Sequence, residues 1–417
     1  MRKPLFPVST RSLTAIAIVA ALAACSAGGT VVPSGSVGDR HIASSRALPG
    51  DSPTPTPSPS PTPGLLGGLI GLVGSVVNLV LTPACSGLLQ CHTLRNTAAG
   101  ANPNPHPWSV KGYTPRQLWS AYGLQAPFGG ATANGPTIAI VDAFDDPSAE
   151  SDLAVYRSQF GLPPCTTANG CFSKLNGSLQ RGANPQANTG WSMEISLDLA
   201  MASSACPTCR ITLVEAATND LTALAQAVDA IAATHPAAIS NSYGAPESAE
   251  ATALDVHYAH PGIAVTASVG DQPGVEFPAS SANVIAVGGT TLTRAQNLRG
   301  WSETALSKSG TGCSAYVARP TWQIAACGNR GVADVSFVAD AATGLAVYDT
   351  QSGGWIVLGG TSAGAPFVAG LYAAAGDFNA QATGAVSLYA KSSKLHQVAG
   401  IPAGDTTLGS PNGLGAF

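Results

Sequence analysis

Charged side chains are scarce in this sequence, and their scarcity limits the partners that the protein can have. Only 10% of the 417 residues are charged, and the formal net charge is −4 at pH 7. A nucleic-acid-binding surface needs a concentration of lysine and arginine, which a chain with 19 such residues and a pI of about 5.9 does not supply. We therefore expect no nucleic-acid partner.

The first 24 residues have the pattern of an export signal. Arg2 and Lys3 lie ahead of an apolar run from Leu13 to Ala24. Leu22-Ala-Ala-Cys25 is similar to the bacterial lipobox, which predicts cleavage before Cys25 and attachment of lipid to its thiol. Ordinary cleavage after a small residue is the alternative. Both alternatives predict an extracytoplasmic protein, either secreted or anchored to the cell envelope.

Nine cysteines are an odd count, which leaves one thiol without a disulfide partner. Lipidation of Cys25 would account for that thiol. The other eight fall into four pairs of near neighbours, which predicts four disulfides: Cys85 with Cys91, Cys165 with Cys171, Cys206 with Cys209, and Cys313 with Cys327. A zinc or redox site at Cys206-Pro-Thr-Cys209 is the alternative, disfavoured because no second such pair or nearby histidine accompanies it.

Two segments without globular character follow the signal. From Ser52 to Pro63 proline occupies every second position, which favours an extended tether, and we assign residues 25–64 to a linker. Leu65 to Leu81 is an apolar run at the short limit for a membrane span. A buried helix or a membrane-surface contact is favoured, because a span would place the disulfides in the reducing cytoplasm. We assign residues 65–104 to an accessory segment.

From about residue 105 the pattern is that of an α/β domain extending to residue 417. Leu221 to Ala233 is predicted to be a helix, with its large apolar residues on one face. Short β-branched runs between Ala/Leu-rich segments predict buried parallel strands: 137–141, 210–214, 238–243, 263–267 and 284–287. The expected fold is a doubly wound parallel sheet with helices on both faces, which binds ligands at the carboxyl ends of its strands.

The most specific local sequence is Gly359-Gly-Thr-Ser-Ala-Gly-Ala-Pro-Phe-Val-Ala-Gly370. Ser362 is the candidate nucleophile, because glycines before it permit a sharp turn and Pro366 suits the first turn of a helix. A helix N-terminus beside Ser362 would favour negative charge that develops there. A simple N-cap serine is the alternative, although an N-cap does not require the whole string.

A pair of carboxylates is the second chemical feature. Glu194 and Asp198 are four residues apart in a segment rich in Leu, Met and Ala, which favours a helix over a strand. In a helix the two groups lie about 6 Å apart, whereas in a strand they would be separated by about 13 Å. A close pair shares a proton and can act as a base toward a serine. The alternative is a pair of like charges on an exposed helix face that has no catalytic role.

Asp271 is the candidate for stabilising an oxyanion. It follows a predicted strand, in Thr266-Ala-Ser-Val-Gly-Asp-Gln-Pro-Gly274, where residues of a binding site are expected. A carboxylic acid that stays protonated in a dry site can donate a hydrogen bond to a tetrahedral intermediate. A turn aspartate before Gln272-Pro273-Gly274 is the alternative.

The string around Ser362 resembles the nucleophile motif that subtilisins and sedolisins share, and the general base separates the two families. A subtilisin-type base would be a histidine in a His-Gly-Thr type motif, but none of the seven histidines is followed by glycine. Asp142 resembles the subtilisin aspartate in position. Without a histidine partner, we interpret Asp142 as a strand-end residue that caps the turn at Asp145-Asp146-Pro147.

Taken together, Glu194, Asp198, Asp271 and Ser362, in this order, resemble the catalytic group of the sedolisin family, and the resemblance covers about residues 105–417. Further strings resemble family sequences: residues 240–244, 277–280, 286–290, 320–323 and 330–336. The resemblance implies a subtilisin-like fold and hydrolysis of peptide bonds at acidic pH. It also implies substrate-binding residues, which we place at Ser242, Tyr243, Gly244 and Gly270.

The sequence departs from the family pattern in three places. The N-terminal segment is shorter than the folded pro-domain that family members carry, which puts zymogen control in doubt. Gln397 stands where the family has a calcium-binding aspartate, and Asp405 alone leaves the cage incomplete. We therefore predict weak or no calcium binding and assign no metal or cofactor. Gln272 and Pro273 follow Asp271 where the family often has Ser-Gly.

The sequence thus predicts an exported serine-carboxyl endopeptidase, active at acidic pH, with peptide or protein substrates. We expect a monomer that reaches the membrane through a lipid on Cys25 where that cysteine is modified. Two alternatives remain open. One is a surface binding protein that kept the peptidase fold and lost turnover. The other is a subtilase in which one of the seven histidines reaches Ser362.

Overall fold

The structure is a computed structural model that describes residues 80–417 except 88, 103–108, 126–134, 325–327, 377, 379–381 and 403–404. The expected signal, Cys25, the tether and nearly all of the apolar run up to Leu81 lie outside the described residues. Cys327 lies outside them too. No helix in the described part of the chain combines the length and the apolar character that crossing a membrane requires.

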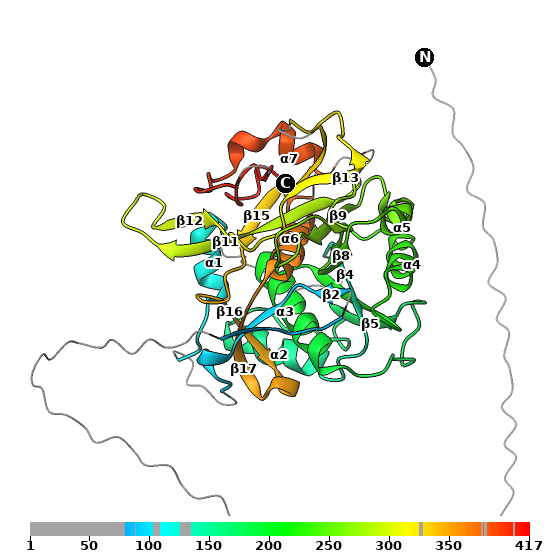
Figure 1. The fold of residues 1–417 in the computed structure, drawn as a ribbon. Helices are drawn as coiled ribbons and strands as arrows, with labels where there is room; N and C mark the ends of the chain where they lie inside the picture. The colour runs from blue at the N-terminus through cyan, green and yellow to red at the C-terminus, as the bar shows by residue number, and fades with distance from the viewer. Residues whose placement is uncertain are drawn as a thin grey trace, which may run out of the picture. The chain divides into compact units, whose positions relative to one another are not determined.

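Strands and helices alternate between residues 137 and 241 of the described chain, and runs of successive strands lie before and after this part (Figure 1). The strands are β1 Leu81–Pro83, β2 Gln90–Cys91, β3 Leu94–Asn96, β4 Thr137–Ala143, β5 Phe172–Asn176, β6 Arg210–Ala216, β7 Ala238–Asn241, β8 Tyr243–Pro246, β9 Ala264–Ser268, β10 Glu276–Phe277, β11 Ile285–Arg294, β12 Trp301–Ala305, β13 Gly312–Ala318, β14 Asn329–Val332, β15 Val335–Val338, β16 Leu345–Asp349 and β17 Gly354–Gly359. The α-helices are α1 Pro115–Ala121, α2 Ala149–Gln159, α3 Thr189–Ala205, α4 Leu221–Ala232, α5 Ala249–Thr252, α6 Gly364–Ala375 and α7 Val386–Ala390, and the 3₁₀ helices are η1 Thr97–Ala99, η2 Ala253–Tyr258, η3 Thr350–Ser352, η4 Thr361–Ala363 and η5 Ser392–Lys394.

A mostly parallel sheet forms the centre of the fold, in the order β12-β11-β9-β7-β4-β6-β5, with β15 also paired to β11. Strands β4, β6, β7 and β9 pair in parallel, and β12 is antiparallel to β11. The five predicted strands and the helix at 221–233 are confirmed, with ends that differ by one or two residues except in β11, which starts one residue later than predicted and extends to Arg294. The predicted fold class is therefore confirmed.

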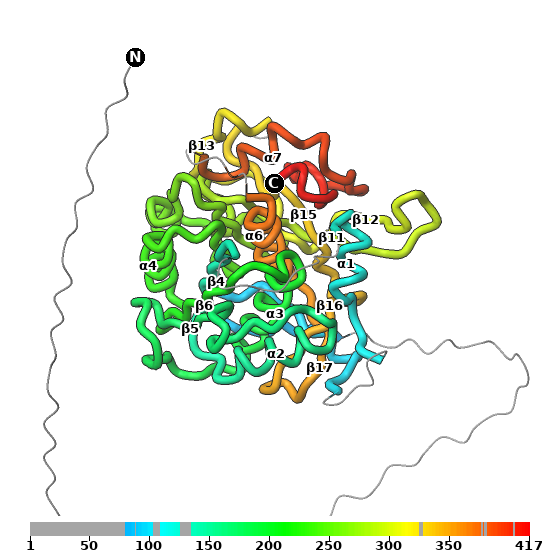
Figure 2. The backbone as a smooth tube through the Cα atoms, turned by 180° about the vertical axis from the view of Figure 1, so that it is seen from behind, coloured from blue at the N-terminus to red at the C-terminus, as the bar shows by residue number. Residues whose placement is uncertain are grey.

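Helices cover both faces of this sheet, and the sequence of β4 explains why. Ile138 and Ile140 join a core with residues of α3 and α6, whereas Ala139 and Val141 join a second core with residues of α4. Side chains alternate between the two faces of a strand, so a strand buried on both faces is apolar throughout. Figure 2 shows α3 and α6 together near the centre and α4 at the side.

The segment between residues 81 and 96 adds strands to two other sheets. β1 pairs with β3, and β3 pairs antiparallel with β17, which leads into the Ser362 turn. β2 pairs antiparallel with β8. The boundary expected at residues 104/105 stays a prediction, but β1, β2 and β3 are hydrogen-bonded into the unit that carries Ser362.

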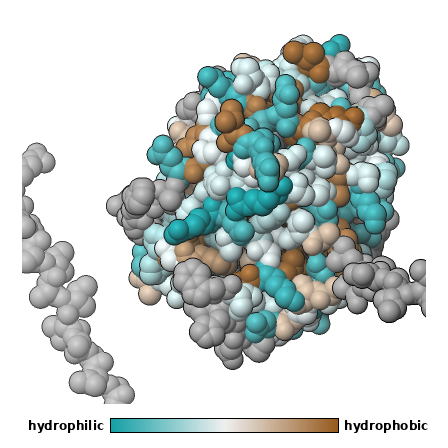
Figure 3. Space-filling model, turned by 90° about the vertical axis from the view of Figure 1, so that its left-hand side faces the viewer, coloured by the Kyte–Doolittle hydropathy of each residue, from teal (hydrophilic) through white to brown (hydrophobic). Residues whose placement is uncertain are grey.

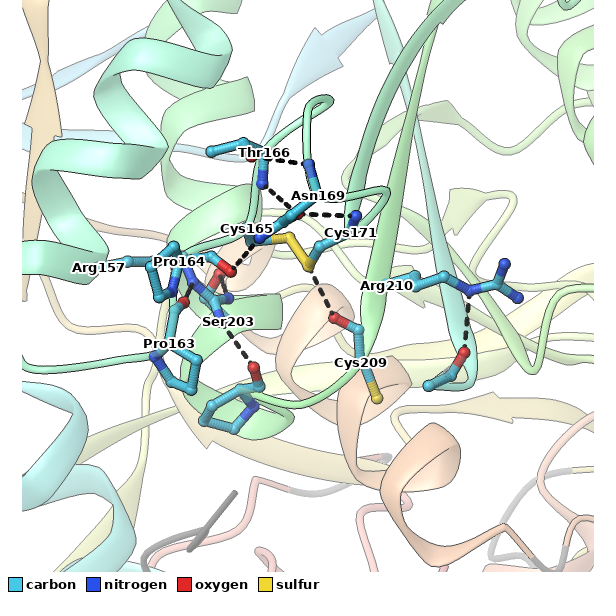
Figure 4. The surroundings of a disulfide bond; sticks show 12 residues. Arg157, Pro163, Pro164, Cys165, Thr166, Asn169, Cys171, Ser203, Cys209 and Arg210 are labelled. Carbon is cyan, nitrogen blue, oxygen red and sulfur yellow. Dashed lines mark hydrogen bonds between the residues drawn. A yellow bond between two sulfur atoms is a disulfide. The ribbon is translucent and has the colours of Figure 1, made fainter. Parts of the chain in front are cut away.

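Three of the four predicted disulfides are confirmed: Cys85–Cys91, Cys165–Cys171 and Cys206–Cys209. Cys327, in the fourth pair, is not among the described residues. Figure 4 shows how Cys165–Cys171 is fixed: Asn169 accepts hydrogen bonds from the backbone of Thr166 and Cys171, and the Cys171 sulfur lies 3.4 Å from the Cys209 carbonyl oxygen. The Cys206-Pro-Thr-Cys209 motif is therefore a disulfide in this structure and not a zinc site.

Apolar side chains on the face shown in Figure 3 lie in separate small patches among polar and neutral ones. The exposed large apolar residues are scattered along the described chain and include Val155, Val256 and Leu298. Such single exposed residues are ordinary on a globular surface. The search for function therefore turns to buried polar groups.

Candidate active site

Ser362 lies in the short helix η4, between the end of β17 and the start of α6, and is fully buried. Gly360, just before it, has a φ of 98°, which favours glycine, and a Cβ there would collide with the carbonyl oxygen of His92. The Ser362 hydroxyl donates to the carbonyl oxygen of Ser242 at 3.3 Å. Its backbone N–H points at the His92 carbonyl oxygen, 3.1 Å away.

Glu194 and Asp198 lie on successive turns of α3, so the predicted helix is confirmed. Asn188 caps this helix by accepting hydrogen bonds from the N–H groups of Gly190 and Trp191. α3 packs against η4 and α6. The Ser362 hydroxyl lies close enough to Glu194 to lower its pKa, and the Ser242 hydroxyl has the same effect on Asp198. Both side chains are fully buried, and none of their oxygens has a hydrogen-bond partner of ordinary geometry among the described residues.

Burial is the main influence on these carboxyl groups. It raises the pKa of Glu194 well above its usual range, and the charge of Asp142 raises it further, whereas the nearby hydroxyls of Ser362 and Thr93 lower it. The pKa of Asp198 is also raised well above its usual range, by burial first and then by Asp142 and Glu194. No cation of the described part of the chain is among the main influences on either group, so the pair holds at least one proton at mildly acidic pH.

Asp142 is a third member of this group of acids, and our interpretation of it as a turn cap is wrong. Its carboxyl is fully buried on β4, and neither oxygen accepts a hydrogen bond from a described residue. The turn is capped by Asp146, which accepts from the Ser148 N–H at 2.9 Å. Burial raises the pKa of Asp142 to about 8. Asp142 therefore acts on Glu194 and Asp198 through space.

Asp271 follows β9 and faces the Ser362 turn. Its Oδ1 accepts from the Thr361 N–H at 2.8 Å, while its Oδ2 is buried with no hydrogen-bond partner among the described residues. A Cβ on Gly360 would also collide with this Oδ2, so the free oxygen and the His92 carbonyl oxygen are neighbours. Burial raises the pKa of Asp271 to about 6, although the charge of His92 opposes the rise.

The four residues expected to bind substrate lie around the same point. Ser242 offers its carbonyl oxygen to the Ser362 hydroxyl and to the His92 N–H. Gly244 belongs to β8, and Gly270 lies just before Asp271. The side chain of Tyr243 is fully buried, and its hydroxyl donates to Asn241 at 2.7 Å, so Tyr243 can offer substrate only its backbone.

His92 is the residue at this site that the sequence gave no reason to select. Its Nδ1 lies 2.7 Å from the Ser268 hydroxyl, and its Nε2 lies 2.8 Å from Glu276 Oε2. The ring is buried, which lowers its pKa, but Glu276 and Asp271 more than offset that effect, so the pKa of His92 is raised overall. Among the described residues, no histidine hydrogen-bonds to the Ser362 side chain, which disfavours a histidine base.

The region where the family would hold calcium offers few ligands. Asp405 Oδ1 accepts from the Thr407 N–H at 2.9 Å and from the Ala333 N–H at 3.5 Å. Across the described ranges, no group of three or more His, Cys, Asp or Glu residues could hold a metal ion. Asp405 with two backbone donors is therefore a poor fit to calcium, and weak or absent calcium binding stays a prediction.

The fold and the buried serine can now be compared with those of known protein families. Residues 183–393 match the subtilase family, which is about half of the chain, and the chain therefore belongs to that family. Within it the relatives are of the sedolisin type, as the resemblance predicted. Kumamolisin from Bacillus sp. (strain MN-32) is 32% identical over 302 residues, a match covering 63% of this chain and 51% of that protein.

Two further comparisons agree with this assignment. Sedolisin from Pseudomonas sp. (strain 101) is 37% identical over 135 residues, which cover 29% of this chain and 23% of that protein. A solved structure of Pseudomonas sedolisin, a serine-carboxyl proteinase complexed with pseudo-iodotyrostatin, matches with a TM-score of 0.57 and 23% identity over 70% of this chain and 89% of that one. That structural likeness concerns the fold. The chain spans about half of the first curated relative and less than a quarter of the second.

Proposed function

We propose that this protein is a serine endopeptidase in which a glutamate is the general base. The observation that carries the proposal is the placement of Ser362 against the buried Glu194, whose pKa the Ser362 hydroxyl lowers. A serine hydroxyl is a weak nucleophile unless a neighbouring base takes its proton. Glu194 is the base that the described residues offer.

Each of the other acidic residues has a distinct part in this proposal. Asp198, one helical turn from Glu194, shares a proton with it and orients it, as the aspartate of a Ser-His-Asp triad orients its histidine. Asp271 donates from Oδ2, and the Ser362 N–H donates beside it, to the oxyanion of the tetrahedral intermediate. The N-terminus of α6 adds positive potential at the same place.

Acidic conditions suit this machinery. Asp271 can donate a hydrogen bond only when protonated, and with a pKa of about 6 its protonated fraction falls as the pH rises through 6. Glu194 and Asp198 keep a shared proton at mildly acidic pH because burial raises both pKa values. Turnover is therefore expected below about pH 6 and should decline above it.

We also propose that the protein works outside the cytoplasm. The signal-like pattern of residues 1–24 and the disulfides Cys85–Cys91, Cys165–Cys171 and Cys206–Cys209 support this location, because disulfides persist in oxidising compartments. Lipid on Cys25 would hold the protein at the cell envelope, and the proline-rich tether would extend at roughly 3 Å per residue.

The test is hydrolysis of a mixed peptide library by the purified protein, expressed as the full chain, from pH 3 to 8. Ser362→Ala is the paired variant, because it removes one oxygen from a buried side chain and leaves the carboxyl groups in place. We expect cleavage at acidic pH that the variant lacks. An optimum near or above pH 8, or equal cleavage by the variant, would refute the mechanism. Folded protein that cleaves nothing would favour the peptide-binding alternative.

A further inference from the structure

The two oxygens of the Asp271 carboxyl group have different surroundings. Oδ1 accepts from the Thr361 N–H at 2.8 Å, whereas Oδ2 is buried and has no hydrogen-bond partner among the described residues. A Cβ on Gly360 would stand 2.7 Å from this Oδ2 and would collide with the His92 carbonyl oxygen, so the two oxygens lie side by side. The Ser362 N–H donates to the same carbonyl oxygen at 3.1 Å, which marks the position proposed for the oxyanion. Oδ1 therefore serves as an anchor, and Oδ2 faces the reaction.

Thr361, which supplies the anchor, is itself held in one orientation. It is fully buried in η4, directly before Ser362. Its methyl group packs against β11, since a Cβ on Gly289 would stand 3.3 Å from Thr361 Cγ2. Its hydroxyl oxygen accepts from the Gly270 N–H at 3.1 Å. A β-branched side chain has few allowed χ1 angles, and contacts on both of its branches select one of them. The fold therefore fixes the direction of the Thr361 hydroxyl.

The Thr361 hydroxyl also acts on Asp271. Because its oxygen accepts from the Gly270 N–H, its own hydrogen is left to donate to another group. Burial dominates the pKa of Asp271 and raises it, but both the N–H and the hydroxyl of Thr361 are among the influences that lower it. A donor lowers the pKa of a carboxyl group by stabilising its ionised form. Two donors of one residue thus point at the same carboxyl group.

A second contact fixes the backbone next to Asp271. The Gly310 N–H donates to the Gly270 carbonyl oxygen at 2.8 Å, so the Gly270 peptide group is held at its N–H by Thr361 and at its carbonyl by Gly310. Gly274, three residues beyond Asp271, pairs with Thr311. The Gln272-Pro273 step, which departs from the family pattern, is therefore held on both sides and does not release Asp271.

We propose that Thr361 is a positioning residue of the oxyanion hole: it holds Asp271 Oδ1 as an acceptor, so that the proton of the acid stays on Oδ2, where the oxyanion forms. A protonated carboxyl group has one oxygen that donates, and donors at the other oxygen favour that arrangement. The inference rests on the proposed function and adds to it the residue that decides which oxygen of Asp271 donates. Thr361 acts through Asp271 and not on the reacting atoms.

Three other titratable groups lie around Asp271, and a test has to leave them in place. The charge of His92 lowers the pKa of Asp271, and the charge of Glu276 raises it. Asp271 in turn raises the pKa of Glu194. A substitution that removes only the Thr361 hydroxyl keeps all three groups.

The first experiment measures kcat against pH for a library peptide that the parent cleaves, beside Thr361→Val. Valine keeps the methyl group and the shape of threonine but has no hydroxyl. The ionised Asp271 loses a donor, so its pKa should rise, and the decline of kcat above about pH 6 should move upward by about 1 pH unit. At pH 4 to 5, kcat should fall about 10-fold, because the proton is no longer confined to Oδ2. Thr361→Ser keeps the hydroxyl and should keep the decline of the parent.

Thr266→Val is the matched control. Thr266 is fully buried on β9, and its hydroxyl donates to the Ala365 carbonyl oxygen at 2.9 Å. It is not among the main influences on Asp271. The same exchange at this position should leave the decline of kcat at the pH of the parent, whatever it does to stability. Equal shifts in Thr266→Val and Thr361→Val would mean that a general loosening of the site moves the profile, and the inference would fail.

The second experiment follows the titration of Asp271 without turnover, by carbon NMR of carboxyl-labelled aspartate in Ser362→Ala protein. The resonance of Asp271 is the one that Asp271→Asn removes. We expect this carboxyl to titrate at about pH 6, and about 1 pH unit higher when Thr361→Val is added. A titration that Thr361→Val leaves unchanged would show that the hydroxyl does not act on Asp271.

The outcomes separate this inference from the proposed function. A lower kcat in Thr361→Val, with the pH profile and the Asp271 titration of the parent, would overturn the inference and leave the serine peptidase standing. A raised Asp271 titration with an unchanged pH profile would show that Asp271 does not limit turnover, against its proposed part in catalysis and against the inference. Folded parent protein that cleaves nothing would overturn the proposed function, and the NMR titration would still decide whether Thr361 acts on Asp271.

Discussion

Two groups of buried acids lie at the end of β4, only a few residues apart, and they differ in one respect. Among the residues that the structure describes, no lysine or arginine is a main influence on Asp142, Glu194 or Asp198. In the neighbouring group, Lys174 forms ion pairs with Asp145 and, at 3.3 Å, with Glu215, and its ammonium donates to the Asp146 carbonyl at 2.6 Å. The Ser362 hydroxyl acts on Glu194 in the first group, whereas it is not among the main influences on Glu215 or Asp146 in the second.

This difference explains how neighbouring carboxyl groups can have different uses. In the second group Lys174 lowers the pKa of Glu215, although burial still raises it to about 8 overall, and the contacts with Lys174 hold these acids in place, so their role is structural. Without a cation, burial raises the pKa of both Glu194 and Asp198, so a carboxylate of the pair that shares one proton is a stronger base toward a nearby hydroxyl than an exposed carboxylate. Glu194 can act as a base because its neighbours are acids and hydroxyls.

The largest expected effect comes from exchanging one glutamate in each group for glutamine. Glu194→Gln removes the proposed base and should lower kcat for peptide hydrolysis by about 10³-fold or more. Glu215→Gln makes the same exchange in the group with the lysine and should retain most of the activity. Steady-state kinetics at pH 4 to 5 measure both, with thermal unfolding as the control for folding. Similar losses of kcat in the two variants would contradict the distinction between a catalytic group and a structural group of acids.

A smaller effect is expected on stability as the pH changes. The folded-state pKa is raised to about 8 for Asp142 and Glu215 and to about 7 for Asp146, so the folded state holds protons that the unfolded state releases above about pH 4. The free energy of unfolding should therefore fall as the pH rises from 4 to 8. His92 acts in the same direction, because its raised pKa stabilises the protonated form in the fold.

Thermal unfolding of Ser362→Ala, which should not digest itself, measures this dependence. We expect Tm to drop by about 5–10 °C between pH 4 and pH 8. A Tm that rises over this range would show that Asp142, Glu215 and Asp146 are ionised in the folded protein at pH 4 to 8, which would contradict their raised pKa values.

The smallest effect is expected from Lys174→Met, which removes the cation that distinguishes the second group. Partial exposure of Lys174 limits the loss, and we expect the free energy of unfolding to fall by about 1–2 kcal/mol. Urea unfolding measures this loss. The pH profile of peptide hydrolysis should stay as it is in the parent, and a shifted profile would mean that the two groups of acids are coupled.

Much of the fold could be predicted because local patterns and burial agree. Thr137-Ile-Ala-Ile-Val141 is apolar on both faces of a strand, and the structure buries it on both faces between helices. The choice of helix for Glu194 and Asp198 depended on Leu, Met and Ala propensities, which packing against α6 reinforces. Cysteines close in sequence form three of the four expected local disulfides, and the fourth pair includes Cys327, which lies outside the described residues.

The rest depended on contacts between residues far apart in the chain, which local patterns do not contain. Asp142 joins the acids on α3 because the strand that carries it, β4, packs against that helix. The residues that follow Asp142 in the sequence suggested a turn cap instead. His92 is 176 residues from Ser268 and 184 from Glu276. Its only local sign is the neighbouring Cys91, whose disulfide with Cys85 indicates a constrained loop, and that sign does not indicate an active site.

The position of that disulfide ties two sheets together. Cys85 lies just after β1, which pairs with β3, and Cys91 ends β2, which pairs with β8. Since β3 also pairs with β17, the bridge is a covalent brace between the strand that leads into the Ser362 turn and the strand that carries Gly244. Reduction would leave each pairing in place but remove the brace, so the chain around His92 would be held by non-covalent contacts alone.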